Sequence, residues 1–481
     1  MFYSRILGRR VLCLVVFMAI HWHTEFAYAQ PFHGMNQEPF ALVDATLPAY
    51  GSALNATTLQ NAITAQGSNK RTIFLKCGTW TLATNVTAPA NITLWMPYCT
   101  FVTINAGITL TLNSPPYVEN PTWHIGTGKL TLLYSLVNMR DMSTAGDGSS
   151  GSPWTGWDTA VTSWKGSITY LLPPGHYQLT APVLLTENAT QLVGAGKDAT
   201  IIHYAPTTSS TTGVLTWASG SQINFRSGGR GFSLVTTNTT NTKVGIKLVD
   251  VSGFMLSDVR VGSDGAWTGT GSIGLLMQGR DASVIEGAEL YGDRPLVISN
   301  NPNSTVDLDH VMFRDLLLQE TIAGANPVVE IESGLNITNV SFDGDQAWYR
   351  GNIGLSWIDT ATTIRGANLT LQNVRWEQGS DPTGYFVQIE HNTALRNLRL
   401  VNLFGALNSR GIRLRNVQAA KLENIQYMGA AIALDLNVTT YPVVLENVWI
   451  GNGTIIKGAL SPAIDSGSSD GRIIPFLVYD R

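Results

Sequence analysis

Charged residues, cysteines and long hydrophobic runs are all scarce in this sequence. Charged side chains make up 13% of the 481 residues, and the formal net charge is −4. Such a balance argues against nucleic acid or an anionic membrane surface as a partner. Beyond the N-terminus no stretch is long and apolar enough to span a membrane, and no long amphipathic helix pattern occurs. Gly, Thr, Asn and β-branched residues are abundant instead, which is typical of an all-β protein.

Residues 1–29 have the pattern of a secretory signal peptide. A basic start precedes an apolar segment, Val11 to Ile20, which is too short to span a membrane. Ala27-Tyr28-Ala29 supplies the small residues of a cleavage site. We therefore predict cleavage after Ala29 and a mature chain that is secreted or held at the cell surface. A retained N-terminal anchor is the alternative.

The segment from Ile168 to Tyr204 contains the clearest local pattern. Pro173-Pro174 suits a corner, because proline fixes φ and cannot donate to a strand ladder, and Gly175 permits the bend that follows. Tyr177 then opens the next strand. Together with the preceding Gly146-Asp147-Gly148, this stretch resembles the opening coil of the pectate-lyase-like right-handed parallel β-helices, the superfamily of pectate lyase 3 and family 28 glycoside hydrolases. The resemblance implies an all-β, single-stranded right-handed parallel β-helix. An ordinary strand–turn–strand is the alternative.

A segment similar to this one lies 97 residues earlier in the chain. Gly78 matches Gly175, and Trp80 matches Tyr177. We therefore interpret residues 30–142 as an N-terminal duplicated β-helical unit and residues 143–481 as the main parallel β-helix. A separate small β-helix preceding the main one is the alternative for the N-terminal region.

Two cysteines lie within the duplicated unit, Cys77 and Cys99, about one coil apart. Export permits a disulfide between them, and neighbouring coils stack at a spacing that suits one. We predict a bridge, with two buried free thiols as the alternative.

From residue 254 onward, a second repeat of the form Leu-x-Asn recurs with apolar neighbours. Its irregular spacing indicates a solenoid with loop insertions. Stacked Asn side chains can hydrogen-bond one another and tolerate a left-handed backbone, so we interpret the recurring Asn as structural. The instances are Leu256-Ser-Asp258, Leu308-Asp-His310, Ile337-Thr-Asn339, Leu371-Gln-Asn373, Leu395-Arg-Asn397, Leu422-Glu-Asn424 and Leu445-Glu-Asn447.

Residues at one offset from the repeated Asn should form a column along the solenoid. Four positions after it come Arg314, Asp343 and Glu377, and Asp345 lies beside Asp343. Carboxylates on neighbouring coils can split their pKa values, which suits general acid and base roles. We therefore predict Asp343, Asp345, Glu377 and Arg314 as catalytic residues. A solvated surface of ion-paired side chains is the alternative.

Aromatic side chains near this column offer flat surfaces for stacking on sugar rings. We predict Trp267, Trp348, Tyr349, Arg350 and Trp376 as substrate-binding residues. Core packing of the tryptophans is the alternative.

Two further polar groups stand out. Glu330 and Glu332 alternate on one strand, so they would share a face. His310 takes the place of a repeated Asn, and we interpret it as a substitute in the Asn ladder rather than as a base.

The motifs that carry catalysis in the resembling families are missing. The Asn-Thr-Asp, Asp-Asp, Gly-His-Gly and Arg-Ile-Lys elements of family 28 polygalacturonases do not occur, and neither does the Arg-x-Pro-x-x-Arg element of pectate lyases. No catalytic residue can therefore be assigned from the resemblance. We expect no metal site and no cofactor; Ca²⁺ would enter only if the reaction is a lyase reaction.

Together these features predict an exported protein that binds an acidic or complex polysaccharide and cleaves it, by hydrolysis or elimination, in a groove along the β-helix. The alternative is a non-catalytic surface protein: a glycan-binding module, an adhesin or a spike. The oligomeric state stays open.

Overall fold

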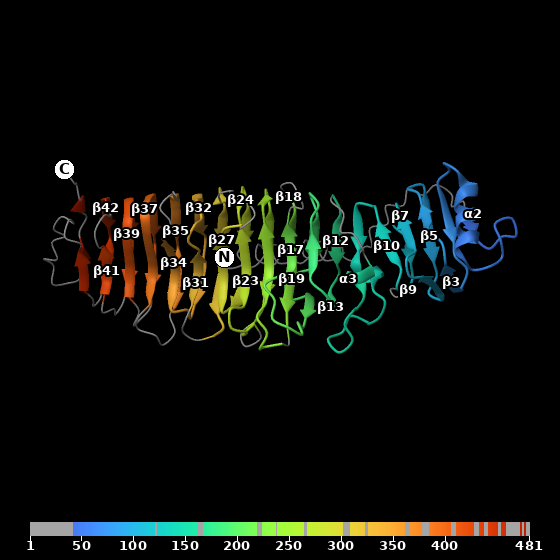
Figure 1. Ribbon diagram of the computed structural model, residues 1–481, viewed down its shortest axis with the longest axis horizontal. Coiled ribbons are helices and arrows are strands. Elements are labelled where there is room, and N and C mark those ends of the chain that lie inside the picture. Colours follow the sequence, from blue (N-terminus) through green and yellow to red (C-terminus); the bar gives the residue numbers. More distant parts are fainter. Residues whose placement is uncertain are drawn as a thin grey trace, which may run out of the picture.

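The computed structural model describes residues 42–477 apart from 121–122, 161–166, 219–223, 237, 264–266, 302–307, 323–325, 361–365, 378–383, 406–409, 428–431, 437–440, 451–453, 458–471 and 474–475. The strands stack into an elongated rod, with α2 near one end and β41 and β42 near the other (Figure 1). The predicted signal peptide lies outside the described residues.

Each coil contributes strands to three sides of the rod. In one early coil these are β2 (Arg71–Phe74), β3 (Gly78–Leu82) and β4 (Val86–Ala88), which pair in parallel with β5, β6 and β7 of the next coil. We name the three sides after this order: side 1 continues from β2, side 2 from β3 and side 3 from β4.

The strands follow this order along the rod. Side 1 contains β1 (Leu42–Asp44), β2, β5 (Ile92–Met96), β8 (Tyr117–Val118), β11 (Leu136–Asn138), β12 (Thr169–Leu172), β15 (Gln191–Gly194), β25 (Val284–Glu286) and β29 (Met312–Arg314). Side 2 contains β3, β6 (Thr100–Ile104), β9 (His124–Gly126), β13 (Gly175–Leu179), β16 (Thr200–Tyr204), β26 (Glu289–Gly292), β30 (Leu317–Glu320), β33 (Gln346–Tyr349), β36 (Val374–Glu377), β38 (Phe404–Gly405), β40 (Gln426–Tyr427) and β43 (Val448–Ile450). Side 3 contains β4, β7 (Thr109–Leu112), β10 (Lys129–Leu132), β14 (Val183–Leu185), β17 (Gly213–Ala218), β20 (Val244–Val249), β23 (Ile273–Gln278), β27 (Arg294–Ser299), β31 (Pro327–Ile331), β34 (Ile353–Asp359), β41 (Ile432–Leu436) and β44 (Thr454–Lys457).

Other strands lie at the corners. Those that continue around a corner are β19 (Gly228–Val235), β22 (Met255–Val261), β32 (Ile337–Asp343), β35 (Ala367–Gln372), β37 (Tyr385–Val401), β39 (Arg410–Glu423) and β42 (Tyr441–Glu446). Four short strands precede side 1, namely β18 (Asn224–Phe225), β21 (Val251–Ser252), β24 (Arg280–Asp281) and β28 (Leu308–Asp309). Because strands such as β19 pair with both β15 and β16, most strands from β11 onward join one 34-stranded sheet. The fold is the right-handed parallel β-helix that the sequence predicts.

Two columns of left-handed residues make the corners on either side of side 1. Within each coil the second left-handed residue comes five positions after the first, so a short strand separates them. The first column is Arg226, Gly253, Ala282, His310, Asn339, Asn368, Asn397 and Ala419, and the second is Gly231, Asp258, Gly287, Asp315, Gly344, Asn373, Asn402 and Asn424. Left-handed geometry costs little for Gly and Asn, which explains their recurrence here.

Amide side chains link the coils within both columns. In the first column Asn397 Nδ2 donates to Asn368 Oδ1 at 3.0 Å, and Asn368 Nδ2 donates to Asn339 Oδ1 at 2.7 Å. In the second column Asn402 Nδ2 donates to Asn373 Oδ1 at 2.8 Å. The structural role predicted for the recurring Asn is confirmed, but the single series read from the sequence is in fact two separate ladders.

Additional elements lie at both ends of the described rod and between β11 and β12. Helix α2 (Ala56–Gln66) buries Leu59, Ala62 and Ile63 against the first coils, and the Asn55 side chain accepts from Thr58 N at its start. A 3₁₀ helix, η1 (Met139–Met142), and a short helix, α3 (Trp157–Ala160), lie between β11 and β12. At the far end, β45 (Arg472–Ile473) and β46 (Phe476–Leu477) pair antiparallel with β43 and β42, which occupies part of the last exposed edge.

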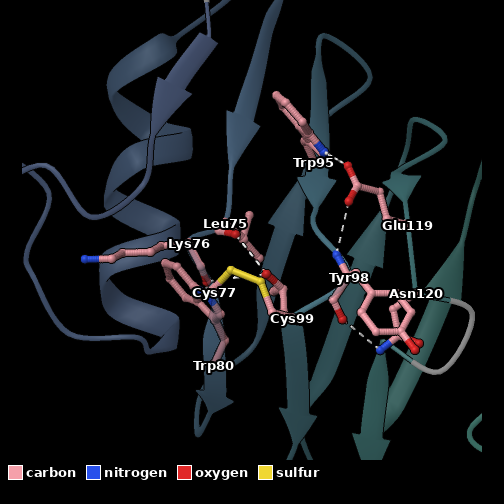
Figure 2. Close-up of a disulfide and its surroundings, with 10 residues drawn as sticks. Leu75, Lys76, Cys77, Trp80, Trp95, Tyr98, Cys99, Glu119 and Asn120 are labelled. Atoms are coloured by element: carbon pink, nitrogen blue, oxygen red, sulfur yellow. Dashed lines mark hydrogen bonds between the residues drawn. A yellow bond between two sulfur atoms is a disulfide. The ribbon is translucent and has the colours of Figure 1, made fainter.

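Cys77 and Cys99 form a disulfide at the corner between sides 1 and 2 (Figure 2). Their Cα atoms are 4.9 Å apart, and Gly78 N donates to Cys99 O at 3.0 Å in the same corner. The bridge therefore joins two successive coils, as its spacing in the sequence predicts.

Candidate functional site

Arg314 and Asp343, two of the predicted catalytic residues, are direct partners on neighbouring coils of side 1. Glu286 precedes Arg314 in the same column, and its Oε1 lies 3.8 Å from Arg314 Nη1. All three side chains are partly exposed at the ends of their strands. The structure thus brings Arg314 and Asp343 together and adds Glu286, which the sequence pattern missed because Ala282 takes the place of the Asn four positions before it.

Asp345 lies just beyond Asp343, across the left-handed Gly344. The backbone N–H of Asp345 donates to Asp315 Oδ1 at 2.7 Å, and the N–H of Gly344 donates to Asp343 Oδ1 at 2.7 Å. A Cβ at Gly344 would lie 2.1 Å from Asp315 Oδ1, so this corner requires glycine. Asp343 and Asp345 therefore flank one tight turn, which the carboxylates of Asp343 and Asp315 help to hold.

Glu377 does not belong to this group. It ends β36 on side 2, where its partner is Tyr349, and Arg375 Nη2 forms an ion pair with its carboxylate. Tyr349 lies four positions after Asp345 along the strand, which is about 13 Å of extended chain. The predicted column is wrong at this residue because Asn339 and Asn373 belong to different ladders, so one offset leads to two different sides.

Three of the predicted sugar-stacking residues lie inside the rod. Trp267, Trp348 and Trp376 are each 0% exposed. Trp348 and Trp376 both pack on Phe386, and their ring centroids lie 6.4 and 5.2 Å, respectively, from the centroid of the Phe386 ring. Their prediction as substrate-binding residues is wrong, because these rings fill the interior of the rod and present no face to a ligand.

The indole N–H groups of these tryptophans are satisfied within the core. Trp348 Nε1 donates to Gln346 Oε1 at 3.4 Å. Trp267 Nε1 donates to Ile273 O at 3.2 Å, and Trp376 Nε1 donates to Arg350 O at 3.3 Å. Strand alternation turns Tyr349 outward next to the inward Trp348, and Tyr349 is half-buried beside Glu377. Arg350 is exposed, and its N–H donates to Glu377 O at 2.8 Å. Tyr349 and Arg350 thus remain at the surface, on side 2.

The other polar groups singled out in the sequence are engaged in ion pairs or ladders. Glu330 Oε2 and Glu332 Oε1 lie 2.6 and 2.9 Å from the guanidinium of Arg294, so this carboxylate pair shares one cation. His310 Nε2 lies 3.3 Å from Asn339 Nδ2 and continues the first ladder, which confirms its role as an Asn substitute.

Another ion-paired group joins the turn before β16 to strands β22 and β26. Arg260 Nε and Lys197 Nζ lie 2.5 and 2.8 Å from the two carboxylate oxygens of Glu289. Burial opposes ionisation of Glu289, but the hydrogen bonds from Arg260 and Lys197 outweigh it and hold the pKa of this carboxyl below its usual value. Glu289 is therefore a structural anion and unsuited to donate a proton.

A group of partly buried charges that the sequence did not suggest lies on side 3. Gln388, Arg413 and Asp435 occupy one outward column across β37, β39 and β41. Arg413 Nε lies 3.1 Å from Glu390 Oε1 and 3.3 Å from Asp435 Oδ2, and Arg415 Nη1 lies 3.2 Å from Glu390 Oε2. We call Tyr385, Glu390, Arg410, Arg413, Arg415 and Asp435 the arginine–carboxylate cluster.

Tyr385 organises the cations of this cluster. The guanidinium carbons of Arg410 and Arg413 lie 5.4 and 5.3 Å from the centroid of its ring, and its hydroxyl donates to Asp435 Oδ2 at 3.4 Å. Within the described part of the chain, no carboxylate lies within ion-pair distance of Arg410. Three arginines accompany two carboxylates, so the cluster carries an excess of positive charge.

Three buried polar atoms of the cluster have no hydrogen-bond partner among the described residues: Arg413 Nε, Arg415 Nε and Asp435 Oδ1. The ion pairs of Arg413 Nε lack the alignment of hydrogen bonds. Buried polar atoms are nearly always satisfied, so these three atoms make the cluster an unusual concentration of unmet donors and acceptors. Because Glu390 Oε1 and Asp435 Oδ2 both approach Arg413 Nε, these two carboxylates are neighbours, as the carboxyl pair of a glycosidase must be.

The sequence indicated this cluster only through the alternation of arginines with apolar residues, and not through a motif. In Arg410-Gly-Ile-Arg-Leu-Arg415, the apolar residues between the arginines are inward and buried, so Arg413 and Arg415 must both point outward. The contact with Asp435 depends on coil stacking, which no local pattern shows.

In the described part of the chain, no group of three or more His, Cys, Asp and Glu side chains is placed to hold a metal ion. A search of the same residues finds no helix with the length and apolar character of a membrane span.

Comparisons with known proteins show similarity at the level of the fold. No family model and no curated protein matches the sequence. Among solved structures, ORF18 of Geobacillus virus E2 is 15% identical with a TM-score of 0.41, covering 67% of this chain and 62% of its own. The gp42 tailspike of Acinetobacter phage vb_AbaP_AS12 is 10% identical with a TM-score of 0.38, covering 69% and 66%. A family 28 exopolygalacturonase from Yersinia enterocolitica is 10% identical with a TM-score of 0.31, covering 88% and 79%. The chain thus spans less than two thirds of the length of the two phage proteins.

Proposed function

We propose that this protein is an exported polysaccharide-binding β-helix whose arginine–carboxylate cluster binds an anionic saccharide. The observation that carries the proposal is the excess positive charge of this group on partly exposed arginines: Arg410 has no carboxylate within ion-pair distance among the described residues, and the Arg415 side chain is 36% exposed. Guanidinium groups bind carboxylate and sulfate oxygens through charge-assisted hydrogen bonds, often in pairs.

Export is supported by the disulfide and by the predicted signal peptide. A bridge such as Cys77–Cys99 persists in an oxidising compartment and is rare in the cytosol.

The binding proposal is tested with the mature chain, residues 30–481, by affinity electrophoresis and calorimetry. The panel pairs anionic polysaccharides, such as polygalacturonate and alginate, with uncharged dextran and xylan. We expect Arg410→Gln and Arg415→Gln to weaken binding of the anionic ligand by about tenfold each. Arg375→Gln is the matched control, because Arg375 pairs with Glu377 on side 2 and should leave binding unchanged. Equal retention by charged and uncharged polysaccharides, or equal loss in all three variants, would contradict the proposal.

Cleavage is the second candidate function, and the closeness of Glu390 and Asp435 favours it. A glycoside hydrolase adds water across the glycosidic bond with two carboxyl groups, one acting as acid and the other as base or nucleophile. The Arg314–Asp343 pair with Asp345, predicted from the sequence, is the competing location for such a reaction.

Reducing-end release and absorbance of unsaturated uronates, measured with and without Ca²⁺, distinguish hydrolysis from elimination. Loss of turnover in Glu390→Gln or Asp435→Asn, with turnover retained in Asp343→Asn and Asp345→Asn, would place the reaction at the cluster. The reverse pattern would place it on side 1. If no polysaccharide that binds is cleaved, the chain is a binding protein of the adhesin or spike class.

A further inference from the structure

An aromatic column faces outward on side 1 of the first coils. Phe74, Trp95 and Tyr117 are register partners on β2, β5 and β8, and Asp44 on β1 precedes them. The ring centroids of Phe74 and Trp95 are 5.3 Å apart, and those of Trp95 and Tyr117 are 5.8 Å apart. Trp95 is half-buried and Tyr117 is 39% exposed, whereas the residues that alternate with them point into the core. This aromatic column therefore presents one ring per coil along the axis of the rod.

Hydrogen bonds hold the middle ring in place. Glu119 Oε1 accepts from Trp95 Nε1 at 3.1 Å, and Glu119 Oε2 accepts from Tyr98 N at 3.2 Å (Figure 2). Tyr98 is itself 71% exposed, and it lies next to the disulfide formed by Cys99. The cross-link and the carboxylate together fix the surface around Trp95 before any ligand arrives, which lowers the entropic cost of binding.

Hydroxyl groups lie close to the aromatic column. Thr93, two positions before Trp95 on the same outward face, has its Oγ1 3.2 Å from Ser114 Oγ. The charged side chains that the pairing and hydrogen bonds place at the column, Asp44 and Glu119, are both acidic. Aromatic rings bordered by hydroxyls suit the C–H faces and hydroxyl edges of sugar rings, and the acidic groups disfavour an anionic chain.

We propose that the aromatic column is a second saccharide-binding surface, specific for an uncharged glycan that lies along the rod with successive sugars over successive coils. This inference rests on the proposed function only in one respect, namely that the protein binds saccharides. Its ligand differs in charge from that of the arginine–carboxylate cluster, and its location is at the opposite end of the molecule (Figure 1).

The test is calorimetry of the mature chain with uncharged hexasaccharides of cellulose, xylan, mannan and starch. We expect Trp95→Ala to weaken binding of the uncharged ligand by about tenfold, and Trp95→Phe to retain most of the affinity, because a ring remains. Leu136→Ala is the control, since Leu136 is also exposed on side 1, 40%, but lies outside the column. Arg410→Gln should leave uncharged binding intact, which separates this site from the cluster.

Three outcomes overturn the proposal. The first is that no uncharged hexasaccharide binds. The second is that Trp95→Ala and Leu136→Ala lose the same amount of affinity. The third is that light scattering shows a dimer that Trp95→Ala converts to a monomer, because a second copy of the chain would then occupy the aromatic column. Circular dichroism and the unfolding midpoint of each variant exclude misfolding as the cause of a loss.

Discussion

Trp80 and Tyr177, which lie 97 residues apart, occupy the same position in two different coils. Both side chains are 0% exposed, and each donates a hydrogen bond to the carbonyl four residues earlier: Trp80 Nε1 to Lys76 O at 3.0 Å and Tyr177 Oη to Pro173 O at 2.9 Å. The preceding glycines, Gly78 and Gly175, have φ values of +132° and +140°. The local conformation of this coil is therefore repeated with different side chains, which is what duplication of a β-helical unit would produce.

Removing the disulfide should destabilise the N-terminal coils. Cys77 and Cys99 close a loop of 22 residues, so the double variant Cys77→Ser/Cys99→Ser should lose about 3 kcal/mol of unfolding free energy in that region. Because coils in a solenoid stabilise their neighbours, the loss should appear as faster hydrogen exchange in β3 and β6 than in the later coils. Treatment of the unmodified protein with a reductant should reproduce the effect, and unchanged exchange in both samples would show that the bridge does not stabilise these coils.

The amide ladders should contribute hydrogen-bond energy that is separable from backbone strain. Asn402 has a φ of +53° and bonds both Asn373 and Asn424 through its side chain. Asn402→Gly keeps the left-handed backbone but removes both amide bonds, which should cost roughly 1–2 kcal/mol. Asn402→Ala adds the left-handed penalty of a Cβ, roughly 1–2 kcal/mol more.

The measurement for the ladder is urea unfolding of the two variants side by side. If the alanine and glycine variants unfolded at the same urea concentration, the backbone conformation at this corner would not limit stability. If neither differed from the parent, the ladder would contribute nothing measurable.

Stability should fall in mild acid because of a buried histidine. The His391 side chain is 0% exposed between Trp357 and Asp359, and burial lowers its pKa to about 4 despite the opposing effect of Asp359. The unfolded chain takes up this proton near pH 6.5, so stability is complete above that pH and is lost as the pH falls towards 4. The loss should be roughly 2 kcal/mol at pH 5. His124, whose pKa burial also lowers to about 4, should add a loss in the same window.

Urea unfolding between pH 7.5 and pH 4.5 checks this pH dependence, at roughly the interval where a histidine changes charge. His391→Asn should flatten the slope. His310→Gln is the comparison variant at a surface histidine, since 66% of that side chain is exposed. An unaltered slope in His391→Asn would mean that another group titrates.

Sequence reasoning predicted the fold because the corners and strands are local features. The residue types of Pro173-Pro174-Gly175 and of the recurring Asn predict the backbone conformation of the corners. The alternation of apolar and polar residues predicts which face of each strand points inward. The site was harder because it depends on which residues meet across coils. Asn339 and Asn373 look alike in sequence, yet they make different corners, and this misplaced Glu377.

Aromatic residues show the same limit. Trp348 and Trp95 both lie on strands of alternating residues, but one is inward and the other outward, and only the register of the whole coil decides between them. The exposed column at Phe74, Trp95 and Tyr117 arises from residues 21 to 43 positions apart, a spacing set by loop lengths that no motif describes. A contact such as Arg413 with Asp435 is likewise a product of stacking.

Salt should distinguish the two proposed saccharide sites. Binding of an anionic polysaccharide through Arg410 and Arg415 is electrostatic, so its affinity should fall steeply between about 0.01 M and about 1 M NaCl, as the Debye length shrinks from about 30 Å to about 3 Å. Arg410→Gln should reduce that salt dependence as well as the affinity, because one cation fewer contributes. Binding of an uncharged hexasaccharide at Trp95 should change little over the same range, since stacking on a ring does not depend on screening.

The two titrations are done on one preparation, by calorimetry, so that a difference in slope cannot arise from the protein sample. If both ligands showed the same salt dependence, and Arg410→Gln altered both, a single site would have to account for all binding, and the assignment of the aromatic column to a separate ligand would be wrong.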